Sequence, residues 1–136
     1  MLNSNEWQEK HDQFLSNSQN LLCKSEECLS HLEMIGDDED AIEGLLTNLL
    51  KLSLEAQSAS IESLADFSSK LQQWLAEACQ YPGFSPEILN TLKSCLELMS
   101  WQLELIDPQT GELLMDCDEQ QALLAKLSEI SSISDQ

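Results

Sequence analysis

Arginine and valine are both absent from this chain of 136 residues, and only 6 lysines face 25 aspartates and glutamates. The formal net charge is therefore −19. Proteins that bind nucleic acids hold the phosphates with clusters of Lys and Arg, and the six lysines form no such cluster along the chain. The shortage of positive charge argues against direct binding to nucleic acid and, for the same reason, to anionic membrane surfaces.

Long apolar runs are also missing. No segment approaches eighteen consecutive apolar residues, and the first twenty lack the basic start and apolar stretch of a secretory signal. These absences predict a soluble, cytoplasmic protein without a membrane span. The cysteines form no CxxC pair and are odd in number, which favours reduced thiols over a disulfide framework; they are Cys23, Cys28, Cys79, Cys95 and Cys117.

The residues that dominate the chain are Leu, Glu, Gln, Ser and Ala, which favour helix over strand. A seven-residue apolar spacing predicts one long first helix that ends at Gly36. The acidic residues 37–40 then suit the positive N-terminal dipole of a second helix. The seam of the first helix is Trp7, Phe14, Leu21, Cys28 and Ile35, with Leu15, Leu22 and Leu29 beside it.

Three more helices follow from the same reasoning. The second helix is expected over about 38–58, with hydroxyls at Ser58 and Ser60 available to cap a third, and Ser85-Pro86 has the chemistry of an N-cap and first helical residue. A turn is expected at 107–111. The apolar series of the third helix is Ile61, Leu64, Leu71, Trp74, Leu75 and Cys79, and that of the fourth is Ile88, Leu92, Cys95, Met99, Leu103 and Ile106.

A shorter fifth helix is predicted near the end of the chain. A capping box from Asp118 to Gln121 precedes its leucines, and the polar residues 131–136 are expected to fray. With no repeat and no long linker, residues 1–136 are predicted to form one all-α domain. The expected architecture is an antiparallel four-helix bundle with an additional short C-terminal helix.

Catalytic and metal-binding patterns are weak. Carboxylate pairs are expected by chance on so acidic a chain, and the four glycines stand singly rather than in a phosphate loop. A bundle that binds two metal ions needs Glu-x-x-His motifs, but the residues three positions before His11 and His31 are Gln8 and Cys28 rather than glutamate. A zinc site built from Cys23, Glu27, Cys28 and His31 would need a second group of ligands elsewhere in the sequence, and there is none. The sequence therefore predicts no enzyme, no cofactor and no metal.

The second helix carries more leucine than a core stripe needs. In the stretch EGLLTNLLKLSLEAQ, Leu45 and Leu49 lie close to Ile42 on a helical wheel. At 100° per residue, Leu50 and Leu54 lie about 80° and about 120° away from Ile42, beyond the edge of a core stripe. They are either an exposed partner site or are buried by the third helix, the fifth helix or a second copy of the chain.

The order of helices and three segments within residues 14–130 resemble the histidine phosphotransfer (HPt) domain of chemotaxis histidine kinases. FLSNSQNLLCKSEECLSHLE is similar to the first-helix pattern of that family. DAIEGLLTNLLKLSLEAQSASIESLADFSSKLQQWLAEA resembles the helix-turn-helix around the phosphorylated histidine, and GELLMDCDEQQALLAKLSEI resembles the leucine-rich tail. The resemblance implies a four-helix bundle that docks to receiver or histidine-kinase domains.

The chain departs from this family at every functional position. The resemblance places Leu50 where the phosphorylated histidine would be, Ser53 where a lysine would be, and Leu54 and Glu55 where small residues would be. Leucine has no lone pair with which to attack a phosphoryl group. The resemblance thus implies a pseudo-HPt domain, which keeps the docking shape and lacks the phosphate acceptor.

The predicted function is a non-catalytic signalling adaptor or inhibitor in a two-component or chemotaxis pathway. An apolar patch rimmed by polar groups is a typical partner site. Two alternatives stay open: an acidic mimic of nucleic acid that inhibits a DNA-binding protein, and a small acidic chaperone of the secretion type. The expected partner-binding residues are Leu46, Thr47, Leu50, Lys51, Ser53, Leu54 and Gln57.

Overall fold

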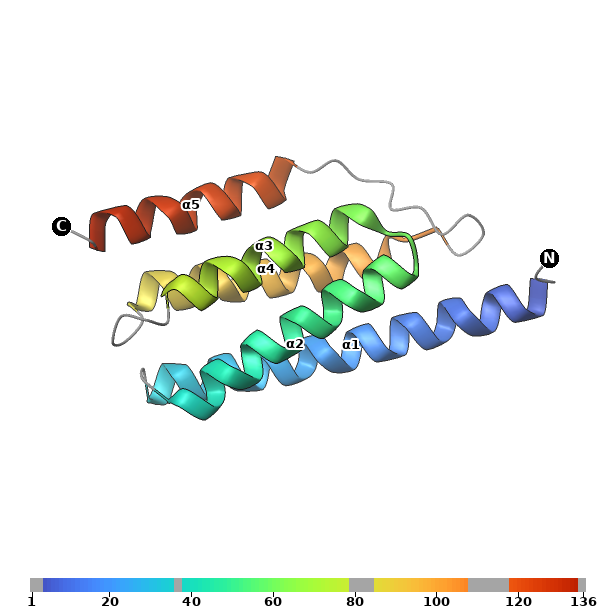
Figure 1. Ribbon diagram of the computed structural model, residues 1–136, viewed down its shortest axis with the longest axis horizontal. Coiled ribbons are helices and arrows are strands. Elements are labelled where there is room, and N and C mark those ends of the chain that lie inside the picture. The colour runs from blue at the N-terminus through green and yellow to red at the C-terminus, as the bar shows by residue number, and fades with distance from the viewer. Residues whose placement is uncertain (1–3, 36–37, 79–84, 108–117, 135–136) are drawn as a thin grey trace.

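Figure 1 shows the computed structural model of the chain, which describes residues 4–35, 38–78, 85–107 and 118–134. The regular secondary structure of these residues consists of five α-helices, so the predicted all-α class is confirmed. The helices are α1 (Ser4–Met34), α2 (Glu39–Ser58), α3 (Glu62–Ala78), α4 (Pro86–Glu104) and α5 (Asp118–Ser134).

Two helices begin as their sequences predict. Asp38 is the N-cap of α2, and its side chain accepts a hydrogen bond of 3.3 Å from the backbone N–H of Ala41. Ser85 is the N-cap of α4, with Pro86 as the first helical residue, and its hydroxyl accepts a bond of 3.2 Å from the N–H of Ile88. These side chains occupy donors that the first helical turn leaves without partners.

The turn between α2 and α3 differs from expectation. Ser60 does not cap α3; it adopts a left-handed conformation with φ of 63° and closes α2. Its N–H donates to the carbonyl of Gln57 and the N–H of Ile61 donates to the carbonyl of Ala56, at 3.0 and 2.9 Å. This pair of bonds is a Schellman motif, and the buried side chains of Ala56 and Ile61 supply its usual apolar contact.

The last helix is longer than predicted. It continues through Ser134, beyond the start of the expected frayed tail at residue 131. Asp118, predicted as the N-cap, is its first helical residue. The rest of the tail, residues 135–136, and most of the predicted turn at 107–111 lie outside the described residues.

Consecutive helices run in alternating directions along the long axis of the molecule (Figure 1). α1 packs closely on α2 and α4, α2 also packs on α3, and α5 lies against α4 and less extensively against α3. Although α3 and α4 overlap in Figure 1, they are not among the closely packed pairs, and α5 contacts both. The antiparallel four-helix bundle therefore stays a prediction, and α5 packs against α4 and α3.

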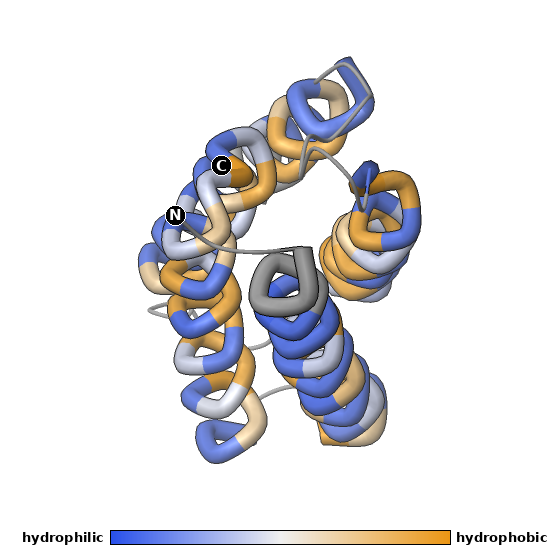
Figure 2. Tube along the Cα trace, turned by 90° about the vertical axis from the view of Figure 1, so that its right-hand side faces the viewer, coloured by the Kyte–Doolittle hydropathy of each residue, from blue (hydrophilic) through white to orange (hydrophobic). Residues whose placement is uncertain are grey.

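The hydrophobic core takes side chains from all five helices. In Figure 2 each helix alternates between hydrophilic and hydrophobic residues along its course, as amphipathic helices do. The six apolar residues predicted for α4, from Ile88 to Ile106, are all buried. Leu89, Leu96 and Leu98 are buried as well. α4 therefore buries a wider arc than its predicted stripe.

The buried stripe of α1 is rotated from the predicted seam. It follows spacings of three and four residues, and it includes serines that an apolar pattern does not identify. The predicted seam residue Ile35 is 55% exposed, and Leu21 and Cys28 are only partly buried. The buried residues of α1 are His11, Phe14, Ser18, Leu22, Ser25, Leu29 and Leu32.

Candidate partner-binding surface

Two leucines stand on the outer surface of α2, one helical turn apart. Leu50 is 49% exposed and Leu54 is 53% exposed, although leucine is among the residue types most often buried. The neighbouring side chains of Thr47, Lys51 and Gln57 are exposed, and Leu46 is partly buried. We call Leu46, Thr47, Leu50, Lys51, Leu54 and Gln57 the α2 patch.

The opposite face of α2 is firmly anchored. Leu45, Leu49, Leu52 and Ala56 are buried in the core. Because these four residues fix the rotation of the helix about its own axis, the two exposed leucines are held on the outside. The angular positions derived for Leu50 and Leu54 from the sequence are confirmed.

Ser53 was expected among the partner-binding residues, and the structure places it elsewhere. Its side chain is 3% exposed, and its hydroxyl donates a hydrogen bond of 2.9 Å to the carbonyl of Ala65 on α3. Ser68 of α3 donates in return to the carbonyl of Leu49, at 2.7 Å. Ser53 thus joins two helices and cannot contact a partner at the surface.

Burial of the two leucines by α3 or α5 was the alternative to an exposed patch. About half of each side chain remains open to solvent beside the other described residues of the chain. Neither α3 nor α5 therefore buries Leu50 and Leu54. Coverage by a second copy of the chain stays an open prediction.

The leucines of the α2 patch carry no group that could take part in catalysis. Its ionisable side chain is Lys51, on a chain with a net charge of −19. The histidines His11 and His31 both lie on α1, where His11 is buried. Hydrocarbon side chains offer contact area and exclude water, but they hold no proton or phosphoryl group.

The residues considered as zinc ligands in the sequence, and the thiols of Cys28 and Cys95, lie within the described part of the chain. In the part of the chain that is described, no group of three or more His, Cys, Asp or Glu side chains could hold a metal ion. Burial, together with the negative charges of Glu27 and Asp38, raises the pKa of the Cys28 thiol. Burial alone raises the pKa of Cys95 to about 12. Both effects disfavour the nucleophilic thiolate.

A second exposed apolar site was not predicted from the sequence. Trp101 of α4 is 56% exposed, and Leu105, the C-cap of this helix, is 42% exposed. The predicted stripe of α4 correctly included Met99 and Leu103, but no prediction was made for the residues outside the stripe. On a helical wheel, Trp101 lies outside the buried arc of α4, as Leu50 lies outside that of α2. A large apolar residue outside the buried arc is therefore a signal that could have identified Trp101 from the sequence.

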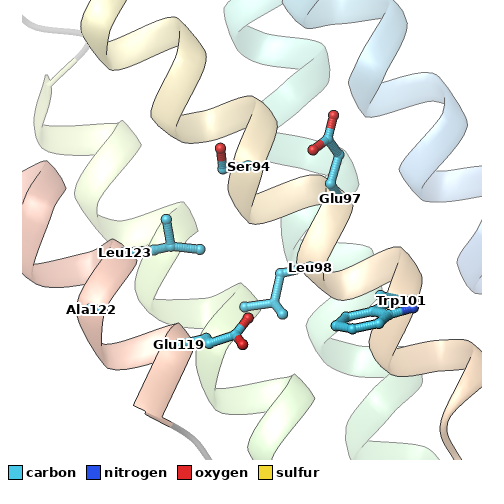
Figure 3. Close-up of a pocket in the computed structure, with 7 residues that line it drawn as sticks. All are labelled: Ser94, Glu97, Leu98, Trp101, Glu119, Ala122 and Leu123. Carbon is cyan, nitrogen blue, oxygen red and sulfur yellow. The ribbon is translucent and has the colours of Figure 1, made fainter.

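Trp101 borders an open groove of about 500 Å³ between α4 and α5, which Figure 3 shows in close-up. Apolar atoms make up most of its wall. The residues that line it are Ser94, Glu97, Leu98, Trp101, Glu119, Ala122 and Leu123.

Comparisons of this chain with protein-family models, curated proteins and solved structures gave no significant match. Among the described residues, no helix is both long enough and apolar enough to cross a membrane.

Proposed function

We propose that this chain is a non-catalytic protein-interaction domain of the HPt-like type, which binds a receiver or histidine-kinase domain and transfers no phosphoryl group. The observation that carries the proposal is the exposure of Leu50 and Leu54 on successive turns of one helix. The proposed docking surface is the α2 patch, which does not include the buried Ser53. A four-helix bundle formed by the first four helices, which the resemblance implies, is part of the same proposal.

The chemistry of the patch supports binding without transfer. Phosphotransfer requires a nucleophile with a lone pair at the position that faces the partner, and Leu50 has none. Burying two half-exposed leucines in an interface contributes about 1 kcal/mol or more each. Polar neighbours such as Thr47, Lys51 and Gln57 would form a rim around this centre.

The proposal is tested by measuring binding to a panel of isolated receiver and histidine-kinase domains by isothermal titration calorimetry. Leu50→Glu places a charge in the centre of the patch, and we expect it to weaken binding at least tenfold. The matched control is Leu105→Glu, which charges an exposed leucine on α4 and should leave the affinity unchanged. Equal effects of both variants, or no binding to any member of the panel, would overturn the proposal.

Transfer itself is tested with an autophosphorylated histidine kinase. We expect no label to pass from the kinase to this chain. A labelled product that is stable in base and labile in acid, as phosphohistidine is, would contradict the proposal. Salt adds a further criterion: apolar docking should weaken only modestly at high ionic strength, whereas mimicry of nucleic acid predicts a collapse of affinity.

A further inference from the structure

The groove between α4 and α5 is a second surface, separate from the α2 patch. α2 is not closely packed against either α4 or α5. On α4, the groove extends from Ser94 to Trp101. Seven residues of helix rise about 10 Å, so this length matches about two turns of a partner helix.

The groove combines an apolar floor with negative charge. Leu98 is buried beneath it, and Leu123 of α5 points toward α4 across it (Figure 3). The carboxylate of Glu119 and the indole of Trp101 project into the space beside Leu98, one from each helix (Figure 3). Glu97 stands at the rim. An aromatic ring and a carboxylate on either side of Leu98 are a favourable environment for a cationic side chain.

We infer that the α4–α5 groove binds a basic amphipathic segment of a partner protein, with an apolar anchor against Leu98 and Leu123 and a Lys or Arg between Trp101 and Glu119. Charge complementarity selects this occupant. A second copy of the chain would bring a further net charge of −19 to the groove, and nucleic acid would bring phosphates. A cationic segment is instead attracted by the net charge and held locally by the indole and the carboxylate.

The experiment uses a synthetic 18-residue helical peptide with leucines along one face and arginines flanking them, titrated into the full chain by calorimetry. Saturable binding at one site is expected. Trp101→Ala should weaken it about tenfold, the range of a partly desolvated cation–π contact. Glu119→Gln should weaken it about twofold to fivefold, because Glu119 is exposed and exposed ion pairs contribute little. Both altered residues lie at the surface, and circular dichroism verifies that each variant is folded.

Controls separate the groove from general attraction to an acidic protein. Glu33→Gln removes one exposed charge from α1 and should leave the affinity unchanged. An equal loss from Glu33→Gln and Glu119→Gln would overturn the inference. So would unchanged binding by Trp101→Ala, absence of any peptide binding, or a dimer of this chain that Trp101→Ala dissociates.

Discussion

The hydroxyl of Ser53 on α2 donates a hydrogen bond to the backbone carbonyl of Ala65 on α3. Ser68 of α3 makes the reciprocal bond to the carbonyl of Leu49 on α2. Such short bonds from serine to the opposite backbone require that the two helices approach closely. Small residues on both faces make that approach possible, since Ala56 is also fully buried. The α2 patch is therefore displayed on a helix with little freedom to rotate.

Enlarging Ser53 should disturb this close approach. We expect Ser53→Leu to lower the free energy of unfolding by about 1–3 kcal/mol, because the added volume overpacks the α2–α3 interface. Urea denaturation followed by circular dichroism measures the change. The control is Gln57→Leu, which adds a leucine to the exposed face and should alter stability by less than about 0.5 kcal/mol. Equal stabilities of the two variants would contradict the burial of Ser53.

The parts of the fold that the sequence predicted are those where apolar spacing alone decides burial. All six residues predicted for the fourth helix are in the core, although Ile106 lies beyond the end of α4. The start of α4 follows from the capping chemistry of Ser85-Pro86, and that of α2 follows from the acidic residues at its N-terminus. In the candidate site, helical angles placed Leu50 and Leu54 off the core stripe, and the structure decides between exposure and burial by showing both side chains about half exposed. The identity of the partner did not follow, because a hydrocarbon surface carries little chemical specificity.

Other features could not be predicted because they depend on tertiary distances. Ser53 has the same residue type as surface serines, and only the nearness of α3 makes it a buried donor. Ser60 resembles a helix cap in sequence, yet the Schellman bonds of α2 place it in a left-handed conformation. The groove at Trp101 exists only because α5 returns to lie against α4.

Because Ser60 has a left-handed conformation, we expect glycine to be more stable than alanine at this position, which is the reverse of the order inside a helix. Left-handed backbone costs a residue with a β-carbon roughly 1 kcal/mol relative to glycine. We therefore expect Ser60→Gly to be more stable than Ser60→Ala by about 1 kcal/mol in urea denaturation. At Ser30, exposed within α1, the order should be the opposite, with Ser30→Ala the more stable by about 1 kcal/mol. The same order at both positions would contradict the positive φ of Ser60.

We expect substitutions at Gly44 of α2 and Cys28 of α1 to have effects on stability that depend on each other. A β-carbon built at Gly44 would lie 3.0 Å from the Cys28 sulfur, which is closer than normal contact. In a helix interior, Gly→Ala otherwise stabilises by about 1 kcal/mol. We expect Gly44→Ala to give most of this gain when Cys28 is already Ala, and clearly less when the sulfur is present. A double-mutant cycle measures the difference, and strict additivity would show that the sulfur moves away without cost.

The buried thiol of Cys95 predicts a loss of stability in alkaline solution. Burial raises its pKa from the ordinary value of 9.0 to about 12. Below pH 9.0 the thiol is protonated in both the folded and the unfolded chain, so its contribution is fully present. Between pH 9.0 and 12 the unfolded chain releases the proton while the folded chain keeps it, so stability falls by about 1.4 kcal/mol per pH unit.

The measurement compares urea unfolding of the parent and of Cys95→Ala at pH 8.0 and at pH 10.5. The alanine variant is less stable at pH 8.0 because it leaves a cavity in the core. Its other ionisable groups still titrate, so its pH profile supplies the baseline. Between these two pH values we expect the parent to lose about 2 kcal/mol more than the variant does. Parallel profiles would mean that the Cys95 thiol ionises as readily in the folded chain as in the unfolded one, which is incompatible with its position in the core of α4.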